Sequence, residues 1–181
     1  MHFRAIFYLP VVLLIVFALS FTNADNTIYG HWKLVREKST DLVTWRYRQL
    51  ELEIRNHQGA VTILQNWVRR KKIGYVDSMT FTPGKGASYT VQQTPTWSGN
   101  WYMGILSQVG SRKKIYGEWK EQHRVLQVET EEVLQTSQGE AVVKTVREYS
   151  LENNGETLIV HEKRSTRPTP IVLVFEKHLK E

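Results

Sequence analysis

The sequence predicts an all-β fold: a single antiparallel up-and-down barrel of about eight to ten strands that follows an N-terminal signal peptide. Three observations lead to this expectation. Apolar and polar residues alternate in several short runs, turns rich in Gly and Asn separate these runs, and no amphipathic helix of three turns is found after the N-terminus. Antiparallel strands without helices to cover them have to stack as two sheets or close on themselves.

The N-terminus is typical of a secretory signal. A positively charged start precedes a long apolar run from Ala5 to Phe21, and a polar tripeptide follows that ends in the small residue Ala24. We therefore expect residues 1–24 to be a signal peptide, and residues 25–181 to form one secreted or periplasmic barrel domain. An uncleaved membrane anchor is the alternative, because the apolar run exceeds the usual length of a signal core.

Alternation with a period of two identifies the strands. Leu50, Leu52 and Ile54 alternate with charged residues, as a strand with one wet face requires. The same pattern recurs over residues 61–67, 126–130 and 143–149. Turn residues that tolerate positive φ separate the runs at 56–59, 83–86, 137–139 and 153–155.

Helical structure is expected to be minimal. The best candidate is a single turn within Thr40 to Arg46. Because consecutive hairpins pair each strand with its chain neighbour, an up-and-down barrel is favoured over a Greek-key sandwich.

The stretch Gly30-His31-Trp32 resembles the G-x-W signature on the first strand of the calycin superfamily, which includes lipocalins and fatty-acid-binding proteins. Residues 145–160 are similar to the penultimate hairpin of a fatty-acid-binding protein, 174–177 to its closing strand, and 116–130 to a hairpin of small bacterial lipocalin-like domains. The resemblance implies a lipocalin-like barrel in which Trp32 closes one end. It also implies that Gly30 is needed because a side chain there would collide.

The departures from fatty-acid-binding proteins concern the ligand. Their Arg-x-Tyr clamp for the fatty-acid carboxylate aligns with Leu173 and Phe175, so this clamp is absent. A second inward arginine of that family aligns with Arg147, which shares a strand face with Tyr149. A buried Arg147 needs an anionic partner, and a ligand carboxylate, an internal glutamate or a flipped strand with Arg147 in water all remain open.

The aromatic residues complete the candidate ligand site. Trp67 is placed by its strand either in a cavity wall or in the core. Trp97 and Trp101 lie in the one loop rich in Pro, Ser and Gly, which suits a barrel mouth or a partner contact. The candidate ligand-binding residues are thus Arg147, Tyr149, Trp67, Trp97 and Trp101, and Gly30 and Trp32 are candidates for closing the barrel.

Catalysis, metals and cofactors are not expected. The chain has no Cys, its six His residues show no ligand spacing, and no hydrolase, P-loop or calcium-binding motif is present. The basic clusters are not interleaved with aromatic residues on one strand, so a nucleic-acid role is disfavoured. We expect a monomer that binds a small hydrophobic or amphipathic ligand without altering it.

Basic clusters carry the alternative function. The formal net charge is +6, and the excess gathers at Arg69–Lys72, Arg112–Lys114 and Lys163–Arg167. Such clusters are usually solvated loop ends. The competing hypothesis is a barrel with a filled core that contacts a macromolecular partner or, weakly, an anionic membrane surface.

Overall fold

The computed structural model describes residues 27–41, 49–69, 72–84, 90–93, 98–100, 105–107, 112–136 and 139–178. The expected signal peptide, Trp97, Trp101 and most of the expected turn at Thr40 to Arg46 lie outside these ranges. The described elements are β1 (Gly30–Leu34), η2 (Arg36–Lys38), β2 (Gln49–His57), β3 (Ala60–Arg69), β4 (Lys72–Phe81), β5 (Thr90–Gln93), β6 (Ser98–Asn100), β7 (Ile105–Ser107), β8 (Arg112–Lys120), β9 (Val125–Thr136), β10 (Gly139–Glu152), η3 (Asn153–Gly155), β11 (Thr157–Arg164) and β12 (Arg167–Lys177).

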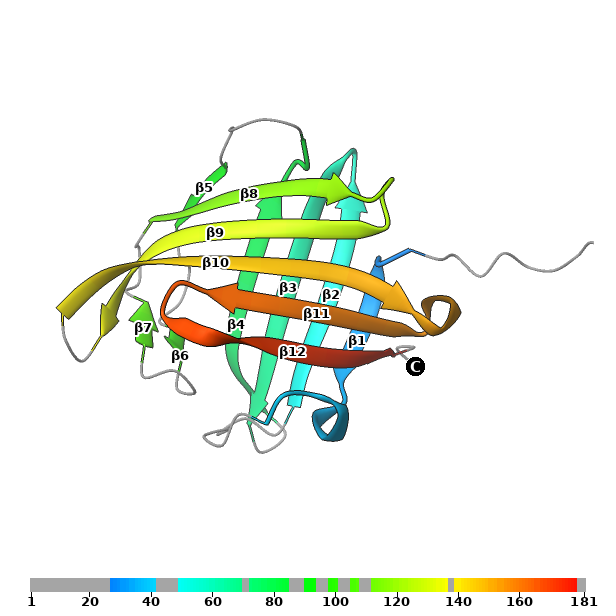
Figure 1. Ribbon diagram of the computed structural model, residues 1–181, viewed down its shortest axis with the longest axis horizontal. Helices are drawn as coiled ribbons and strands as arrows, with labels where there is room; N and C mark the ends of the chain where they lie inside the picture. The colour runs from blue at the N-terminus through cyan, green and yellow to red at the C-terminus, as the bar shows by residue number, and fades with distance from the viewer. Residues whose placement is uncertain are drawn as a thin grey trace, which may run out of the picture.

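The predicted all-β barrel is confirmed. The described strands form one antiparallel sheet, in which β8 to β12 run across the view and β1 to β4 cross behind them (Figure 1). The first strand pairs with the last, since Trp32 of β1 lies opposite Lys177 of β12 on one side and Leu52 of β2 on the other. On the side of β9 that faces away from β10, β8 pairs with Val125–Glu132 and β7 pairs with Leu134 and Gln135. The short strands β5, β6 and β7 have only three or four residues each, and they were not anticipated.

The barrel is nearly, not fully, closed by backbone ladders. Among the described residues no ladder joins β4 to β8. Within the same ranges, three polar contacts bridge this gap instead. The Gly84 amide donates to the Gly117 carbonyl at 3.0 Å, the Tyr116 hydroxyl donates to the Gly84 carbonyl at 3.3 Å, and the Lys113 ammonium donates to Asp77 at 2.9 Å. A seam whose described residues share a single backbone hydrogen bond is the part of a barrel that can widen at the lowest cost in backbone hydrogen bonds.

The seam also contains a close approach that requires glycine. A Cβ added at Gly117 would lie 2.0 Å from the Phe81 ring. We expect Gly117→Ala to lower the free energy of unfolding by about 1–3 kcal/mol, because the ring has to move within a packed core. Urea denaturation measures this, with Gly84→Ala as the matched control, since nothing lies within 4 Å of a Cβ at Gly84. Equal losses in the two variants would contradict the proposed packing of the seam.

Two of the predicted turns are confirmed and two extend beyond the described residues. The turn after β2 has positive φ at Gln58 (50°) and Gly59 (85°), and η3 has positive φ at Asn153 (50°) and Asn154 (55°). A 3-10 turn, η2, precedes the segment where a single helical turn was expected. It leads into a segment that continues along β12, where the Thr40 amide donates to the Val172 carbonyl at 2.8 Å.

The alternation of side chains produces a buried inner face that is partly polar. Near Trp32 this face is apolar, with Ile54, Ile63 and Phe175 each at most 1% exposed. Farther along the strands, buried polar side chains lie opposite one another in the register. These register pairs are Gln65 with Asp77, Thr130 with Thr145, Thr145 with Arg164, and Arg147 with Glu162. The interior therefore joins an apolar end to a polar region.

Candidate functional site

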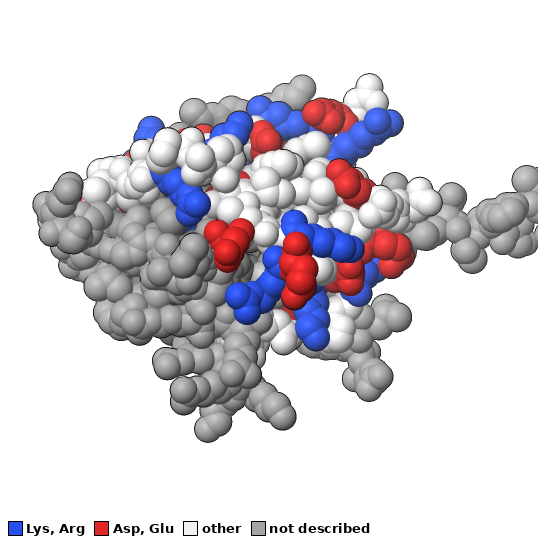
Figure 2. Space-filling view, turned by 60° about the horizontal axis from the view of Figure 1, so that its bottom comes forward, with Lys and Arg blue, Asp and Glu red and all other residues white. Residues whose placement is uncertain are grey.

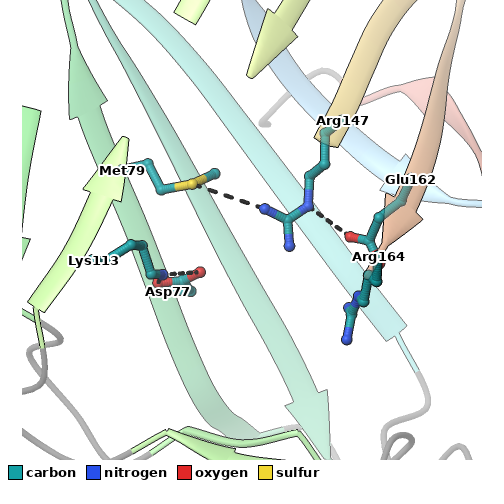
Figure 3. Close-up of polar contacts among 6 residues, drawn as sticks. All are labelled: Asp77, Met79, Lys113, Arg147, Glu162 and Arg164. Carbon is teal, nitrogen blue, oxygen red and sulfur yellow. Dashed lines mark hydrogen bonds and ion pairs between the residues drawn. The ribbon is translucent and has the colours of Figure 1, made fainter. Parts of the chain in front are cut away.

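Three charged side chains form the centre of the polar region (Figure 3). Arg147 projects inward from β10, and Glu162 and Arg164 project inward from the neighbouring strand β11. The Nε atom of Arg147 donates to Glu162 Oε2 at 2.6 Å, and the Nε atom of Arg164 donates to Glu162 Oε1 at 2.6 Å. One carboxylate thus bridges two guanidinium groups that are 13% and 4% exposed.

A second ion pair lies on the other side of the interior. Lys113 of β8 donates to both carboxylate oxygens of Asp77 on β4, at 2.9 and 3.1 Å, and Glu132 lies 3.9 Å from the same ammonium. Met79 lies two residues after Asp77 on β4, and its sulfur is 4.0 Å from Arg147 Nη1 (Figure 3). Three cations and three anions therefore occupy this region, so its formal charge is balanced.

The electrostatics keep Glu162 and Arg147 ionised. Burial would raise the pKa of the Glu162 carboxyl, but the positive charges of Arg147 and Arg164 outweigh burial and lower this pKa to about 2. Burial would likewise lower the pKa of the Arg147 guanidinium, and the Glu162 carboxylate raises it above its ordinary value. Glu162 is accordingly a fixed anion at neutral pH and not a proton donor.

Tyr149 is the exception to this pairing. The side chain is 1% exposed, and its hydroxyl has no hydrogen-bond partner among the described residues. Burial raises the pKa of this hydroxyl, so it is a neutral donor. An unpaired buried hydroxyl costs about 1–3 kcal/mol, which makes it a feature that requires an explanation.

A small internal void lies beside Tyr149 and Arg147. Its volume is about 10 Å³, close to the minimum for one water molecule. The wall is mostly apolar. The lining residues are Leu50, Leu52, Gln65, Trp67, Arg147, Tyr149, Val160, Glu162, Leu173 and Phe175. Side chains therefore fill most of this part of the barrel.

The structure brings three of the five predicted ligand-binding residues to this void. Arg147, Tyr149 and Trp67 all line it. Of the three arrangements left open for Arg147, the internal glutamate is the one observed, and the flipped strand is wrong. Trp97 and Trp101 lie outside the described residues.

The expected reason for glycine at position 30 has to be corrected. A Cβ added at Gly30 would meet nothing within 4 Å, so the expected collision is wrong. Glycine is favoured there because φ is +136°, a conformation that side chains rarely permit. Trp32 is 1% exposed, and its indole N–H donates to the Ile28 carbonyl at 2.9 Å.

Sequence reasoning missed Glu162, Arg164, Asp77 and Lys113. A signal for Glu162 existed: it lies as many residues after the β10–β11 turn as Arg147 lies before it, so the hairpin register pairs them. Asp77 and Lys113 had no comparable local signal, because the seam between β4 and β8 brings them together.

Two of the three basic clusters are not free basic surfaces. Lys113 and Arg164 turn inward and are paired, and Lys114 contacts Glu131 at 2.8 Å on the outer face. On the face in Figure 2, Lys and Arg side chains are interspersed with Asp and Glu. Within the cluster Arg69–Lys72, Arg70 and Lys71 lie outside the described residues.

Two further properties concern the described part of the chain. No group of three or more His, Asp or Glu side chains there has an arrangement that could hold a metal ion. None of its helices has the length and apolar character needed to cross a membrane.

The comparisons with known proteins give two structural similarities at low sequence identity and no match of sequence. No family model matches the sequence, and none of the curated proteins matches it. The structure is similar to secretory abundant heat soluble protein 4 from Ramazzottius varieornatus, with 11% identity and a TM-score of 0.48, over 83% of this chain and 94% of that one. It is also similar to the fatty-acid-binding protein from Manduca sexta, with 10% identity and a TM-score of 0.45, over 82% of this chain and 98% of that one. The barrel assignment rests on the strand pairing described above.

Proposed function

We propose that this protein is a non-catalytic binding protein whose barrel holds a small amphipathic molecule, with an oxygen acceptor of that molecule placed against Arg147 and Tyr149. The observation that carries the proposal is the unpaired hydroxyl of Tyr149 beside a buried guanidinium, at a void with a mostly apolar wall. Ligand sites combine an apolar lining with a few converging polar groups in this way.

Arg147 has donors to spare. Its Nε atom is used by Glu162, whereas the terminal amino groups contact only the Met79 sulfur at 4.0 Å among the described residues. A thioether is a weak acceptor, so these N–H groups favour a better one. A carboxylate or carbonyl oxygen of a ligand can accept from Arg147 and Tyr149 together.

The void has to enlarge when a ligand binds, because about 10 Å³ holds no organic molecule. Two features permit this. Met79 is an unbranched side chain that adopts new rotamers at low cost. The seam between β4 and β8 widens without breaking a backbone ladder.

The pKa values of Glu162 and Tyr149 support a binding role without catalysis. A general acid or base works best with a pKa near the working pH. The lowered pKa of Glu162 and the raised pKa of Tyr149 move both groups away from neutrality. These residues are suited to holding a ligand and not to transferring a proton.

Isothermal titration with dodecanoate, dodecanol and dodecyltrimethylammonium tests the proposal. We expect saturable binding of dodecanoate, weaker binding of dodecanol, and none of the cation, because the site offers donors next to a guanidinium. Tyr149→Phe should weaken dodecanoate by roughly three- to tenfold, the effect of one lost hydrogen bond. The same variant should be no less stable than the wild type, because it removes an unpaired hydroxyl.

Tyr29→Phe is the matched control for this experiment. The Tyr29 hydroxyl accepts a hydrogen bond of 3.0 Å from Asn56 Nδ2 and does not line the void. Its loss should leave dodecanoate affinity unchanged. If no amphiphile of the three binds the folded protein, or if both tyrosine variants weaken binding equally, the barrel site is refuted.

A further inference from the structure

A depression of about 550 Å³ lies at the Trp32 end of the barrel, away from the charged interior. Its lining includes Ile28, Tyr29, Trp119, His123, Arg124 and Leu151. These residues come from the segment before β1, the end of β8 with the turn that follows it, and the end of β10. The volume falls within the roughly 300–1,000 Å³ typical of small-molecule sites.

Three rings form the wall of this depression. Tyr29 and Trp119 meet edge to face, with centroids 6.4 Å apart and planes at 85°, and Trp119 and His123 lie 5.7 Å apart at 46°. The Tyr29 hydroxyl accepts a hydrogen bond of 3.0 Å from Asn56 Nδ2, which fixes its ring from β2. The wall is therefore held in place before any ligand arrives.

The turn that supplies His123 and Arg124 is strained. Glu121, Gln122 and His123 have φ of 49°, 57° and 68°, and none of them is the Gly or Asn that this conformation favours. Each such residue costs about 1–2 kcal/mol in the left-handed region. Strain of this kind concentrates at binding sites, and here it sets the His123 ring against Trp119 with Arg124 next in the chain.

We propose that this depression is a second binding site, which takes a planar aromatic anion. The flat body of the ligand lies against Trp119 and the rings beside it. Its carboxylate or sulfonate meets Arg124, an exposed guanidinium that has no ion pair among the described residues. The site is independent of the barrel interior, since it shares no lining residue with the void at Tyr149.

The experiment follows the indole N–H resonance of Trp119 while naphthalenesulfonate, or the neutral naphthalenemethanol, is added to the full chain. We expect both compounds to shift this resonance saturably. The resonance of Trp67 should not move, because Trp67 lines the void at Tyr149 and not this depression. Arg124→Gln should weaken naphthalenesulfonate by roughly three- to tenfold and leave naphthalenemethanol unchanged.

Arg112→Gln is the control for the charge, since Arg112 is exposed on β8 at the other end of the barrel. It should change neither affinity. Trp119→Leu removes the indole reporter, so its affinities are measured by isothermal titration. The variant keeps the position apolar and should weaken both compounds by about tenfold, as expected for a lost aromatic contact. The proposal is overturned if the Trp119 resonance shows no saturable shift, or if Arg124→Gln and Arg112→Gln have the same effect. Neither outcome bears on dodecanoate binding at Tyr149.

Discussion

Replacing Glu162 with glutamine should lower the free energy of unfolding at neutral pH by about 3–5 kcal/mol. The amide has nearly the same shape but carries no charge, so Arg147 and Arg164 would stay buried without a counterion. Breaking a buried pair in this way costs more than the pair contributes when it is intact. Urea denaturation followed by tryptophan fluorescence measures the loss. Glu156→Gln, at an exposed glutamate just before β11, should change stability by less than about 0.5 kcal/mol.

The Glu162→Gln variant should also differ from the wild type in how its free energy of unfolding depends on pH below 4.5. The pKa of Glu162 is about 2 in the folded protein, below its ordinary value of 4.5. A lowered pKa contributes stability that is complete above pH 4.5 and is lost as the pH falls toward 2. The wild type should lose about 3 kcal/mol from this group across that window. Glu162→Gln should lack this portion of the pH dependence, and parallel pH profiles for the two proteins would refute the bridging role of the carboxylate.

Replacing Lys113 with methionine should lower the free energy of unfolding by about 3 kcal/mol or more, because it leaves the Asp77 carboxylate buried and unpaired at the seam. Lys114→Met is a matched control from the next position on the same strand. Lys114 contacts Glu131 on the outer face and is 52% exposed, so its loss should cost less than about 1 kcal/mol.

The double variant Lys113→Met with Asp77→Leu distinguishes the attraction between the two charges from the free-energy cost of burying them. Replacing both charges with apolar side chains of similar size is often neutral or stabilising. We therefore expect the double variant to regain most of the stability lost in Lys113→Met. A double variant as unstable as the single one would mean that the seam depends on the charges themselves.

These ion pairs also bear on the proposed function. Met79 lies on the same strand as Asp77 and contacts Arg147, and the Asp77–Lys113 pair joins β4 to β8 where no described ladder does. Any ligand that enlarges the void at Tyr149 has to be accommodated next to this seam. The stability of the seam and the affinity for dodecanoate are therefore expected to be linked.

The sequence by itself determined the strands and which of their residues share a face. Side chains alternate across a strand, so Val143, Arg147 and Tyr149 had to share a face, and the Asn-Asn-Gly turn fixed the register that follows. The need of a buried cation for an anion was also predictable. These are local properties, set by backbone geometry over a few residues.

Only the tertiary structure decided which partners meet. Asp77 and Lys113 are 36 residues apart and belong to strands with no described ladder between them, so no local pattern could pair them. The depression at the Trp32 end likewise joins three segments that are distant in sequence, and the need for glycine at Gly30 came from its φ and not from a neighbour. Closing the barrel is what brings such groups together, because contacts across a seam or an open end depend on the path of the whole chain.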